Sequence, residues 1–175
     1  LDSRWVLIVA DNSEQEELWN GRLGKAWVSV EDYIDRMMEP LTGPALDAVN
    51  AQPKDRIIDI GCGCGTTSLS LGAGGAEVRG IDISSTMIDK ANEKTKSNVT
   101  FSVGDAANET FGRNHSVAFS RFGVMFFADP IKAFTNIRNA LIAGGRLVFL
   151  CWQSPSTNPW LSTASIALQP FQPLD

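Results

Sequence analysis

The chain carries the stretch Asp59-Ile60-Gly61-Cys62-Gly63-Cys64-Gly65, between a short apolar run at 56–58 and a segment at 66–71 that can open a helix. A strand, a glycine turn and a helix in this order bring bare backbone to a ligand at the edge of a parallel sheet. Glycine at every second position removes side chains that would block close approach and permits positive φ. The G-x-G-x-G spacing differs from the G-x-G-x-x-G that is typical of pyrophosphate sites. We therefore predict a ligand-binding turn in an α/β sheet.

Acidic residues mark the ends of three expected strands. Asp59 comes just before the glycine turn, where it can orient the loop or meet a cationic ligand group. Asp82 ends a second expected strand over 76–82, and a carboxylate at this separation can accept both hydroxyls of a ribose. Asp105 follows a third expected strand over 99–103. Since parallel strands end at one edge of their sheet, we expect these three acids to gather there.

These segments resemble the three cofactor motifs of class I S-adenosylmethionine-dependent methyltransferases, in the family's order and spacing. The resemblance covers roughly residues 18–160. It implies an α/β fold with a Rossmann-like open parallel sheet in the strand order 3-2-1-4-5 and helices on both faces. It also implies S-adenosylmethionine as the cofactor and S-adenosylhomocysteine as the product.

The resemblance further implies which residues hold the cofactor. The glycine loop would face its methionine part, and Asp82 would bind the ribose hydroxyls. Met87 or Ile83 would pack on the adenine, whose edge would meet Asp105 and Ala106. The complete predicted cofactor set is Asp59, Gly61, Cys62, Gly63, Asp82, Ile83, Met87, Gly104, Asp105, Ala106, Arg121 and Phe122. The sequence assigns no catalytic residue.

The remaining elements follow from periodicity and turn residues. We expect helix over 14–30, weakened by glycines, and over 31–38, where Pro40, Gly43 and Pro44 would break it before a further helix. The fourth strand is expected over 116–120. A helix that Asp129 caps should end at 143–145, before a fifth strand over 146–152. This order divides the chain into an N-terminal extension at 1–50, a cofactor-binding core at 51–153 and a C-terminal segment at 154–175.

The chain ends soon after the fifth expected strand, whereas members of the family continue into a sixth and a seventh. An uncovered edge strand is prone to pairing with another chain. We therefore expect a homodimer that covers strand five, or coverage of this strand by 154–175 or by the apolar run at the N-terminus.

Composition limits the partners. The 175 residues carry a net charge of −5 without a long basic run, which argues against a nucleic-acid partner. An apolar stretch near the roughly 20 residues that a membrane helix needs is absent from the sequence. Three cysteines do not make a disulfide framework, so a reducing cytoplasm is predicted, without a membrane association.

Several residues allow two interpretations. Trp19 and Trp27 can clamp the cofactor or belong to the core, and Arg121 can face a carboxylate of the ligand or form a surface ion pair. The only histidine, His115, is interpreted as a surface or turn residue rather than a catalytic one. The C-x-C of the loop lacks the further ligands of a zinc site, so no metal is predicted. Cys151 is expected to pack in the interior.

Methyltransferases that act on amino nitrogens of nucleobases or glutamine carry an Asn/Asp-Pro-Pro-aromatic run after the fourth strand. In this sequence, which resembles the class I family as a whole, the segment 121–124, Arg-Phe-Gly-Val, occupies that place, so such an acceptor is not expected. The predicted acceptor is therefore a small molecule. Two alternatives remain open from the sequence. One is a nicotinamide-dependent dehydrogenase, and the other is a non-catalytic S-adenosylmethionine-binding or interaction protein.

Overall fold

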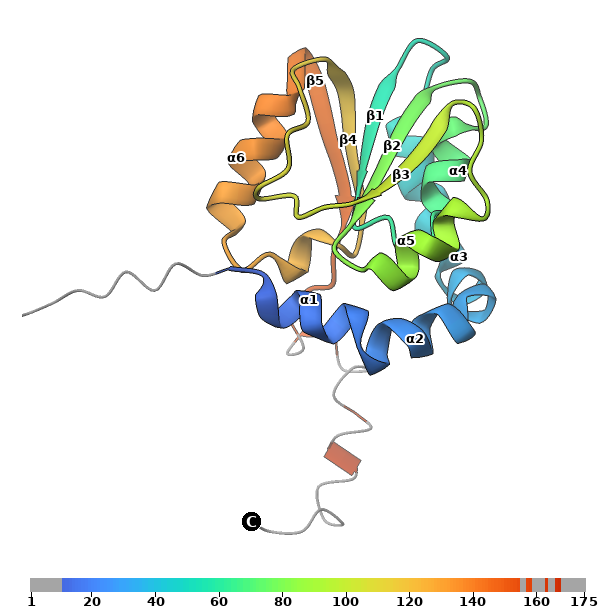
Figure 1. The fold of residues 1–175 in the computed structure, drawn as a ribbon. Helices are drawn as coiled ribbons and strands as arrows, with labels where there is room; N and C mark the ends of the chain where they lie inside the picture. Colours follow the sequence, from blue (N-terminus) through green and yellow to red (C-terminus); the bar gives the residue numbers. More distant parts are fainter. Residues whose placement is uncertain (1–10, 155–156, 159–162, 164–165, 168–175) are drawn as a thin grey trace, which may run out of the picture.

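A computed structural model describes residues 11–154, 157–158, 163 and 166–167. Its centre is a parallel sheet of five strands in the order β3-β2-β1-β4-β5, as predicted. The strands, which Figure 1 labels, are β1 Arg56–Ile60, β2 Glu77–Asp82, β3 Val99–Val103, β4 His115–Arg121 and β5 Leu141–Leu150. The order reverses between β1 and β4, so the crevice at the carboxyl ends of these strands is the expected place for a ligand.

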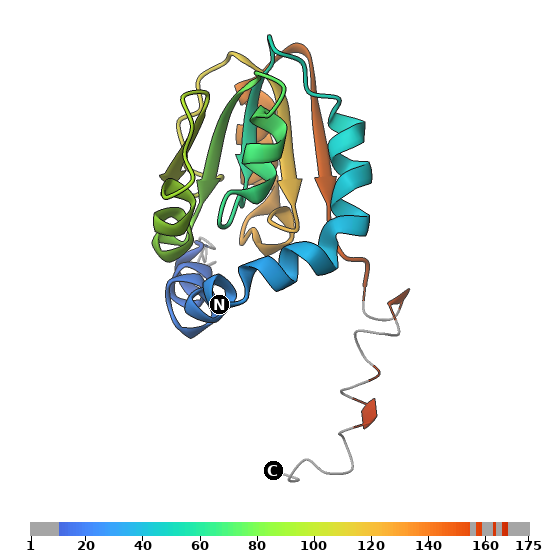
Figure 2. The same ribbon diagram turned by 90° about the vertical axis from the view of Figure 1, so that its right-hand side faces the viewer.

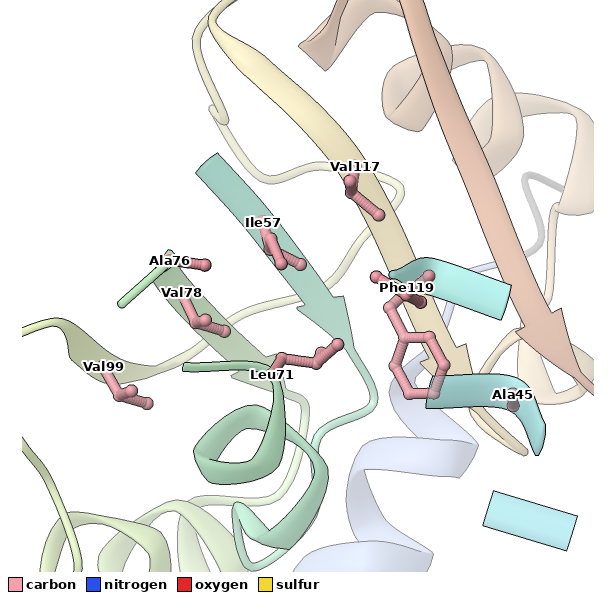
Figure 3. Packing of buried hydrophobic residues seen from close by; sticks show 9 residues of the cluster. Ala45, Ile57, Leu71, Ala76, Val78, Val99, Val117 and Phe119 are labelled. Atoms are coloured by element: carbon pink, nitrogen blue, oxygen red, sulfur yellow. The ribbon is translucent and has the colours of Figure 1, made fainter. Parts of the chain in front are cut away.

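Helices cover both faces of the sheet because neighbouring strand residues point to opposite sides. Ile57 and Phe119 pack with Val49 of α3 (Glu31–Val49) and Leu71 of α4 (Thr66–Gly72), in the cluster that Figure 3 shows. On the other face, Ile58 packs with residues of α6 (Pro130–Ala140). The nearly continuous burial of β1 and β4 follows from this arrangement, with α3 and α4 on one face of the sheet and α6 on the other.

Helix α5 (Ser85–Asn92) begins where the sequence predicts. Ser84 is its N-cap, and its side chain accepts a hydrogen bond from the Met87 amide at 3.2 Å. Asp129 caps α6 in the same way, with the Lys132 amide as donor at 2.9 Å. Both caps fix a helix start next to the carboxyl edge of the sheet.

The N-terminal helices lie across this carboxyl edge. Figures 1 and 2 show α1 (Ser13–Asn20) and α2 (Arg22–Ser29) beneath the ends of the strands, with α3 rising beside the sheet. Here one expectation was wrong, because α3 continues through Pro40 and Pro44. The helix bends instead of ending (Figure 2), and its last part is held by burial of Ala45 and Val49 in the core.

The boundary between α6 and β5 also differs from the prediction. The helix ends at Ala140, and β5 starts at once, where Leu141 pairs with His115. The register then shifts before Val117 pairs with Arg146, and Gly144 takes a φ of +80° in this irregular part. A bulge in β5, which the sequence pattern did not indicate, therefore carries the glycines that we expected to end the helix.

The edge strand β5 presents apolar side chains. Ile142 and Phe149 are 46% and 44% exposed. The segments expected to cover this edge, 1–10 and most of 155–175, lie outside the described residues. Homodimerisation and the division of the chain at 50 and 153 stay predictions. In the part of the chain that is described, no helix is both long and apolar enough to cross a membrane.

Candidate active site

A cavity lies at the carboxyl edge of the sheet, between the strand ends and the N-terminal helices. All five strands contribute to its wall, either by their last residues or by the segments that follow them. The lining from the strand ends includes Gly61, Gly63, Asp82, Ile83, Gly104, Asp105, Ala106, Arg121, Phe122 and Trp152. Most of the residues that the sequence assigned to a cofactor therefore meet at one cavity.

The glycine loop presents bare backbone to the cavity. Gly61, Gly63 and Gly65 have φ angles of +66°, +54° and +90°, which side chains rarely allow. A Cβ on Gly61 would lie only 2.8 Å from the Cα of Gly123, which follows β4. Two loops thus touch through their backbones, and this contact requires glycine at position 61.

Asp82 is the acid best placed to meet a ligand. Its Oδ2 accepts a hydrogen bond from the Gly63 amide at 2.8 Å, and its Oδ1 accepts one from the Ser84 amide at 2.9 Å. The residue is half-buried and lines the cavity, so each oxygen has acceptor capacity left for a ligand. Burial raises the pKa of the Asp82 carboxyl, and the amide donors oppose this effect. The arrangement suits a pair of neighbouring hydroxyl donors.

Asp59 lies behind the loop. It is fully buried, and its Oδ2 accepts hydrogen bonds from Thr67 and Ser68 at 2.7 and 2.6 Å. Its Oδ1 has no hydrogen-bond partner among the described residues, and burial raises the pKa of the Asp59 carboxyl. These contacts join Asp59 to the start of α4, directly after the loop that the sequence predicted it could orient, and its role toward the cofactor stays a prediction.

Asp105 is held by neighbours at the β3 end of the cavity. Its Oδ1 accepts hydrogen bonds from the Asn12 side chain at 2.7 Å and from the Ala107 amide at 2.9 Å. Asn12 in turn accepts a hydrogen bond from the Ala128 amide at 2.9 Å. Asn12 therefore joins the start of α1 to two loops of the cavity. Sequence reasoning missed Asn12, because nothing near it in the chain indicates these distant partners.

The side chains beside the loop are apolar or inert. Met87 is buried, and its Sδ would lie 3.8 Å from a Cβ on Gly63. Burial raises the pKa of the Cys62 thiol well above its usual value and that of Cys64 to about 12, so both remain protonated at neutral pH. Within the described residues, no group of three or more His, Cys, Asp or Glu could hold a metal ion.

Arg121 forms an ion pair at the cavity wall. Its Nη2 lies 2.7 Å from Asp35 Oδ1, and the two side chains are only 13% and 20% exposed. The other oxygen of Asp35 accepts a hydrogen bond from Thr66 Oγ1 at 2.6 Å. The network ties α3 and α4 to the end of β4. The ion pair predicted as one option for Arg121 exists, but it is partly buried and faces the cavity.

The N-terminal helices cover the cavity with aromatic side chains and polar contacts. Trp19 makes edge contacts with Trp27 at 5.7 Å and with Phe126 at 5.3 Å, and all three line the cavity. The Trp19 carbonyl accepts a hydrogen bond from Ser84 at 2.7 Å, and Asn20 accepts hydrogen bonds from Ser85. Trp19 and Trp27 thus both line the cavity, and the clamp on the cofactor stays a prediction.

Two expectations for single residues were wrong. His115 is buried, only 6% exposed, at the start of β4 and therefore at the end of the strand opposite Arg121. Burial lowers the pKa of its imidazole, and Nδ1 has no partner among the described residues. Cys151 is exposed, since it comes after the last residue of β5. Both errors concern strand ends, because β4 begins one residue earlier than predicted and β5 ends at Leu150, before its predicted end at 152.

Comparison with known proteins decides the family. The model of the methyltransferase-domain family matches residues 58–149, more than half of the chain. The chain belongs to this family, as a class I S-adenosylmethionine-dependent methyltransferase. The nicotinamide-dependent alternative has no support from this match.

Curated relatives agree with the family. A demethylmenaquinone methyltransferase from Beutenbergia cavernae is 29% identical over 140 residues, which are 79% of this chain and 56% of that protein. One from Renibacterium salmoninarum is 30% identical over 66% of this chain and 48% of that protein. The methyltransferase chain thus spans about half the length of the curated relatives it matches.

Solved structures share the fold. An S-adenosylmethionine-dependent methyltransferase from Mesorhizobium loti is 28% identical with a TM-score of 0.55, over 61% of this chain and 50% of that one. Phosphoethanolamine N-methyltransferase 2 from Haemonchus contortus is 26% identical with a TM-score of 0.54, over 65% and 29%. The Haemonchus contortus structures contain S-adenosylmethionine in one case, and S-adenosylhomocysteine with phosphomonomethylethanolamine in the other.

The residues of this chain fit such a cofactor. The positive-φ glycines leave a cradle at the β1 end that a Cβ on Gly61 would disturb, and the Asp82 carboxylate opens into the cavity beside it. Gly104, Asp105 and Ala106 extend the same wall to the β3 end. S-adenosylmethionine is the cofactor that this family uses.

Proposed function

We propose that this protein transfers a methyl group from S-adenosylmethionine to a small-molecule acceptor. The observation that supports this most is the arrangement of the glycine loop beside Asp82, in one cavity between the strand ends and the helices α1 and α2. The cofactor supplies an electrophilic methyl group on a sulfonium.

Each part of the cofactor has proposed partners on a different strand end. Gly61, Cys62 and Gly63 hold the methionine part through backbone groups, with Asp59 orienting this loop from behind. Asp82 accepts the two ribose hydroxyls. The apolar side chains of Ile83 and Met87 pack on the adenine, and its polar edge meets the segment Gly104, Asp105 and Ala106. Arg121 and Phe122 line the cavity at the end of β4.

The chain's own contribution to the reaction is mainly positional. A methyl group on a sulfonium needs an acceptor atom held in line at close distance, and well-oriented reactants gain much of their rate from such placement. The charged side chains that line the described cavity are engaged by other groups. Glu31 pairs with Lys94, Asp35 with Arg121, and Asp82 and Asp105 accept amide hydrogen bonds. We therefore assign no general base to this chain.

Three observations support a small acceptor. The cavity lies between the strand ends and the helices α1 and α2, and the chain carries a net charge of −5, which disfavours a nucleic-acid acceptor. The relatives at 29% and 30% identity are named demethylmenaquinone methyltransferases, and the Haemonchus contortus structure contains phosphomonomethylethanolamine. Each of these named compounds is a small molecule.

Calorimetric titration with S-adenosylmethionine, S-adenosylhomocysteine and NAD tests the cofactor part. We expect saturable binding of the first two and none of NAD. A folded protein that binds neither sulfur compound would contradict the proposal. Transfer of a radiolabelled methyl group to panels of phenols, amines and a mixed oligonucleotide tests the acceptor part, and transfer only to the oligonucleotide would contradict it.

A further inference from the structure

The β4–β5 side of the cavity carries a stacked aromatic pair. The rings of Phe122 and Trp152 lie 4.7 Å apart between centroids with an interplanar angle of 14°, and both residues are half-buried and line the cavity. The Phe122 amide donates a hydrogen bond to the Leu150 carbonyl at 2.9 Å, which extends the pairing of β4 with β5. The two rings are therefore carried by neighbouring strand ends.

Phe122 stands in a strained backbone conformation. Its φ is +62°, in the left-handed region that residues with large side chains rarely adopt. Glycine would adopt this φ without strain. Phenylalanine at this position therefore costs backbone strain but supplies an aromatic ring. The strain is held by the Leu150 contact and by the next residue, since the Gly123 amide donates to Ser120 Oγ at 3.2 Å. Backbone strain that the surroundings enforce is common where a side chain serves a ligand.

The position of the pair relative to the proposed cofactor indicates its role. The proposed partners of the adenine, the ribose and the methionine part lie at β3, β2 and β1, in that order across the sheet. The part of the cavity next in this order belongs to β4 and β5. An acceptor would approach the methyl group from a part of the cavity that the cofactor leaves open, and Phe122, Trp152 and Arg121 line the β4–β5 part.

We infer that Phe122 and Trp152 are specificity-determining residues that select an acceptor with a flat aromatic ring. This inference rests on the proposed function and names the acceptor class for the same site. A flat ring can add to an existing stack of parallel rings with its face in contact, which a saturated ring of the same size cannot do equally well. The aromatic pair orients such an acceptor and excludes water from one of its faces.

The test uses two ligands of nearly equal size, 1-naphthol and its saturated analogue decahydro-1-naphthol. Both are titrated into the full chain saturated with S-adenosylhomocysteine. We expect 1-naphthol to bind at least about fivefold more tightly than the saturated compound, because only the aromatic ligand can stack. Trp152→Ala and Phe122→Gly should each remove about fivefold of this preference, whereas Trp152→Phe should keep most of it.

Controls separate a binding role from a structural one. Phe122→Gly relaxes the strained φ, so a loss of selectivity in that variant cannot be ascribed to failure to fold. Phe149→Ala removes an aromatic ring of β5 that is 44% exposed, and it should leave the preference unchanged. The affinity for S-adenosylhomocysteine should stay within about twofold in Trp152→Ala, Trp152→Phe and Phe149→Ala.

Equal binding of the two ligands, or no binding of either, would overturn the inference even if S-adenosylhomocysteine binds. Equal losses of S-adenosylhomocysteine and naphthol in Trp152→Ala would overturn it as well, because the residue would then belong to the cofactor site. If the wild type does not bind S-adenosylhomocysteine, the proposed function fails. The same naphthol comparison on the ligand-free protein then decides whether the aromatic wall exists on its own.

Discussion

The β2–β3 side of the cavity is built from carboxylates that backbone amides hold, whereas its β4–β5 side carries a stacked aromatic pair beside the Arg121–Asp35 ion pair. Asp82 and Asp105 each accept amide hydrogen bonds from residues within their own or a neighbouring loop. Phe122 and Trp152 meet only because β4 and β5 pair. Polar groups in fixed positions suit the cofactor, whose structure is constant. A flat apolar wall suits the methyl acceptor, which differs between enzymes of one fold.

Asp82→Ala should break the polar side most strongly. The variant loses a charged acceptor for two hydroxyls, and each such hydrogen bond contributes roughly 1.5–3 kcal/mol, so we expect an affinity for S-adenosylhomocysteine that is lower by about 100-fold. Calorimetry measures this change. Asp89→Ala on the exposed side of α5 is the matched control and should bind normally. A loss below about threefold in Asp82→Ala would remove Asp82 from the cofactor site.

Gly61→Ala should disturb the boundary between the two sides. The new Cβ would lie 2.8 Å from the Gly123 Cα, at a φ of +66°, so the loops after β1 and β4 must separate. We expect about tenfold weaker cofactor binding and a lower free energy of unfolding, since the left-handed conformation costs alanine roughly 1–2 kcal/mol. Gly74→Ala, whose nearest neighbour would be 4.0 Å away, serves as the control. Identical behaviour of the two variants would contradict the close contact.

Asn12→Ala should loosen the cover over the β3 end. The variant loses the hydrogen bonds to Asp105 and from the Ala128 amide, and a net value of about 1 kcal/mol predicts roughly fivefold faster dissociation of S-adenosylhomocysteine. Stopped-flow displacement measures this rate, with Asn92→Ala at the exposed end of α5 as the control. An unchanged rate would show that α1 does not cover the bound cofactor.

Asp59→Asn should have the smallest effect, visible as a change with pH. Burial raises the native pKa of Asp59 above its unfolded value, so its contribution to stability is complete below the unfolded pKa and is lost as pH rises through the native pKa. Urea unfolding between about pH 4 and pH 7 should therefore show Asp59→Asn gaining stability relative to wild type as pH rises. A difference that does not vary with pH would indicate an unshifted carboxyl.

The polar side could be predicted from the sequence because its signals are local. The glycine loop, Asp82 at the end of a strand and the Ser84 cap all lie within segments whose own composition indicates their conformation. The strand order followed from the family resemblance, and the structure confirms it. Local motifs of this kind predict a site well where the backbone of the same segment forms the site.

The aromatic side and the cover could not be predicted in the same way. Trp152 follows a strand whose bulge at Gly144 shifted its bounds, and Asn12 reaches partners that are 93 and 116 residues away. Pro40 suggested a helix end by local rules, yet core packing of Val49 keeps α3 continuous. These features depend on contacts between distant segments, which a local pattern does not report.

The central claim is that one cavity holds the cofactor at its polar side and a flat acceptor at its aromatic side. Parallel titrations of Asp82→Ala and Trp152→Ala with S-adenosylhomocysteine, and with 1-naphthol in its presence where it binds, test this most directly. We predict that Asp82→Ala loses S-adenosylhomocysteine, whereas Trp152→Ala keeps it and loses the preference for 1-naphthol over decahydro-1-naphthol. Loss of S-adenosylhomocysteine to the same extent in both variants would contradict a cavity with two separate sides.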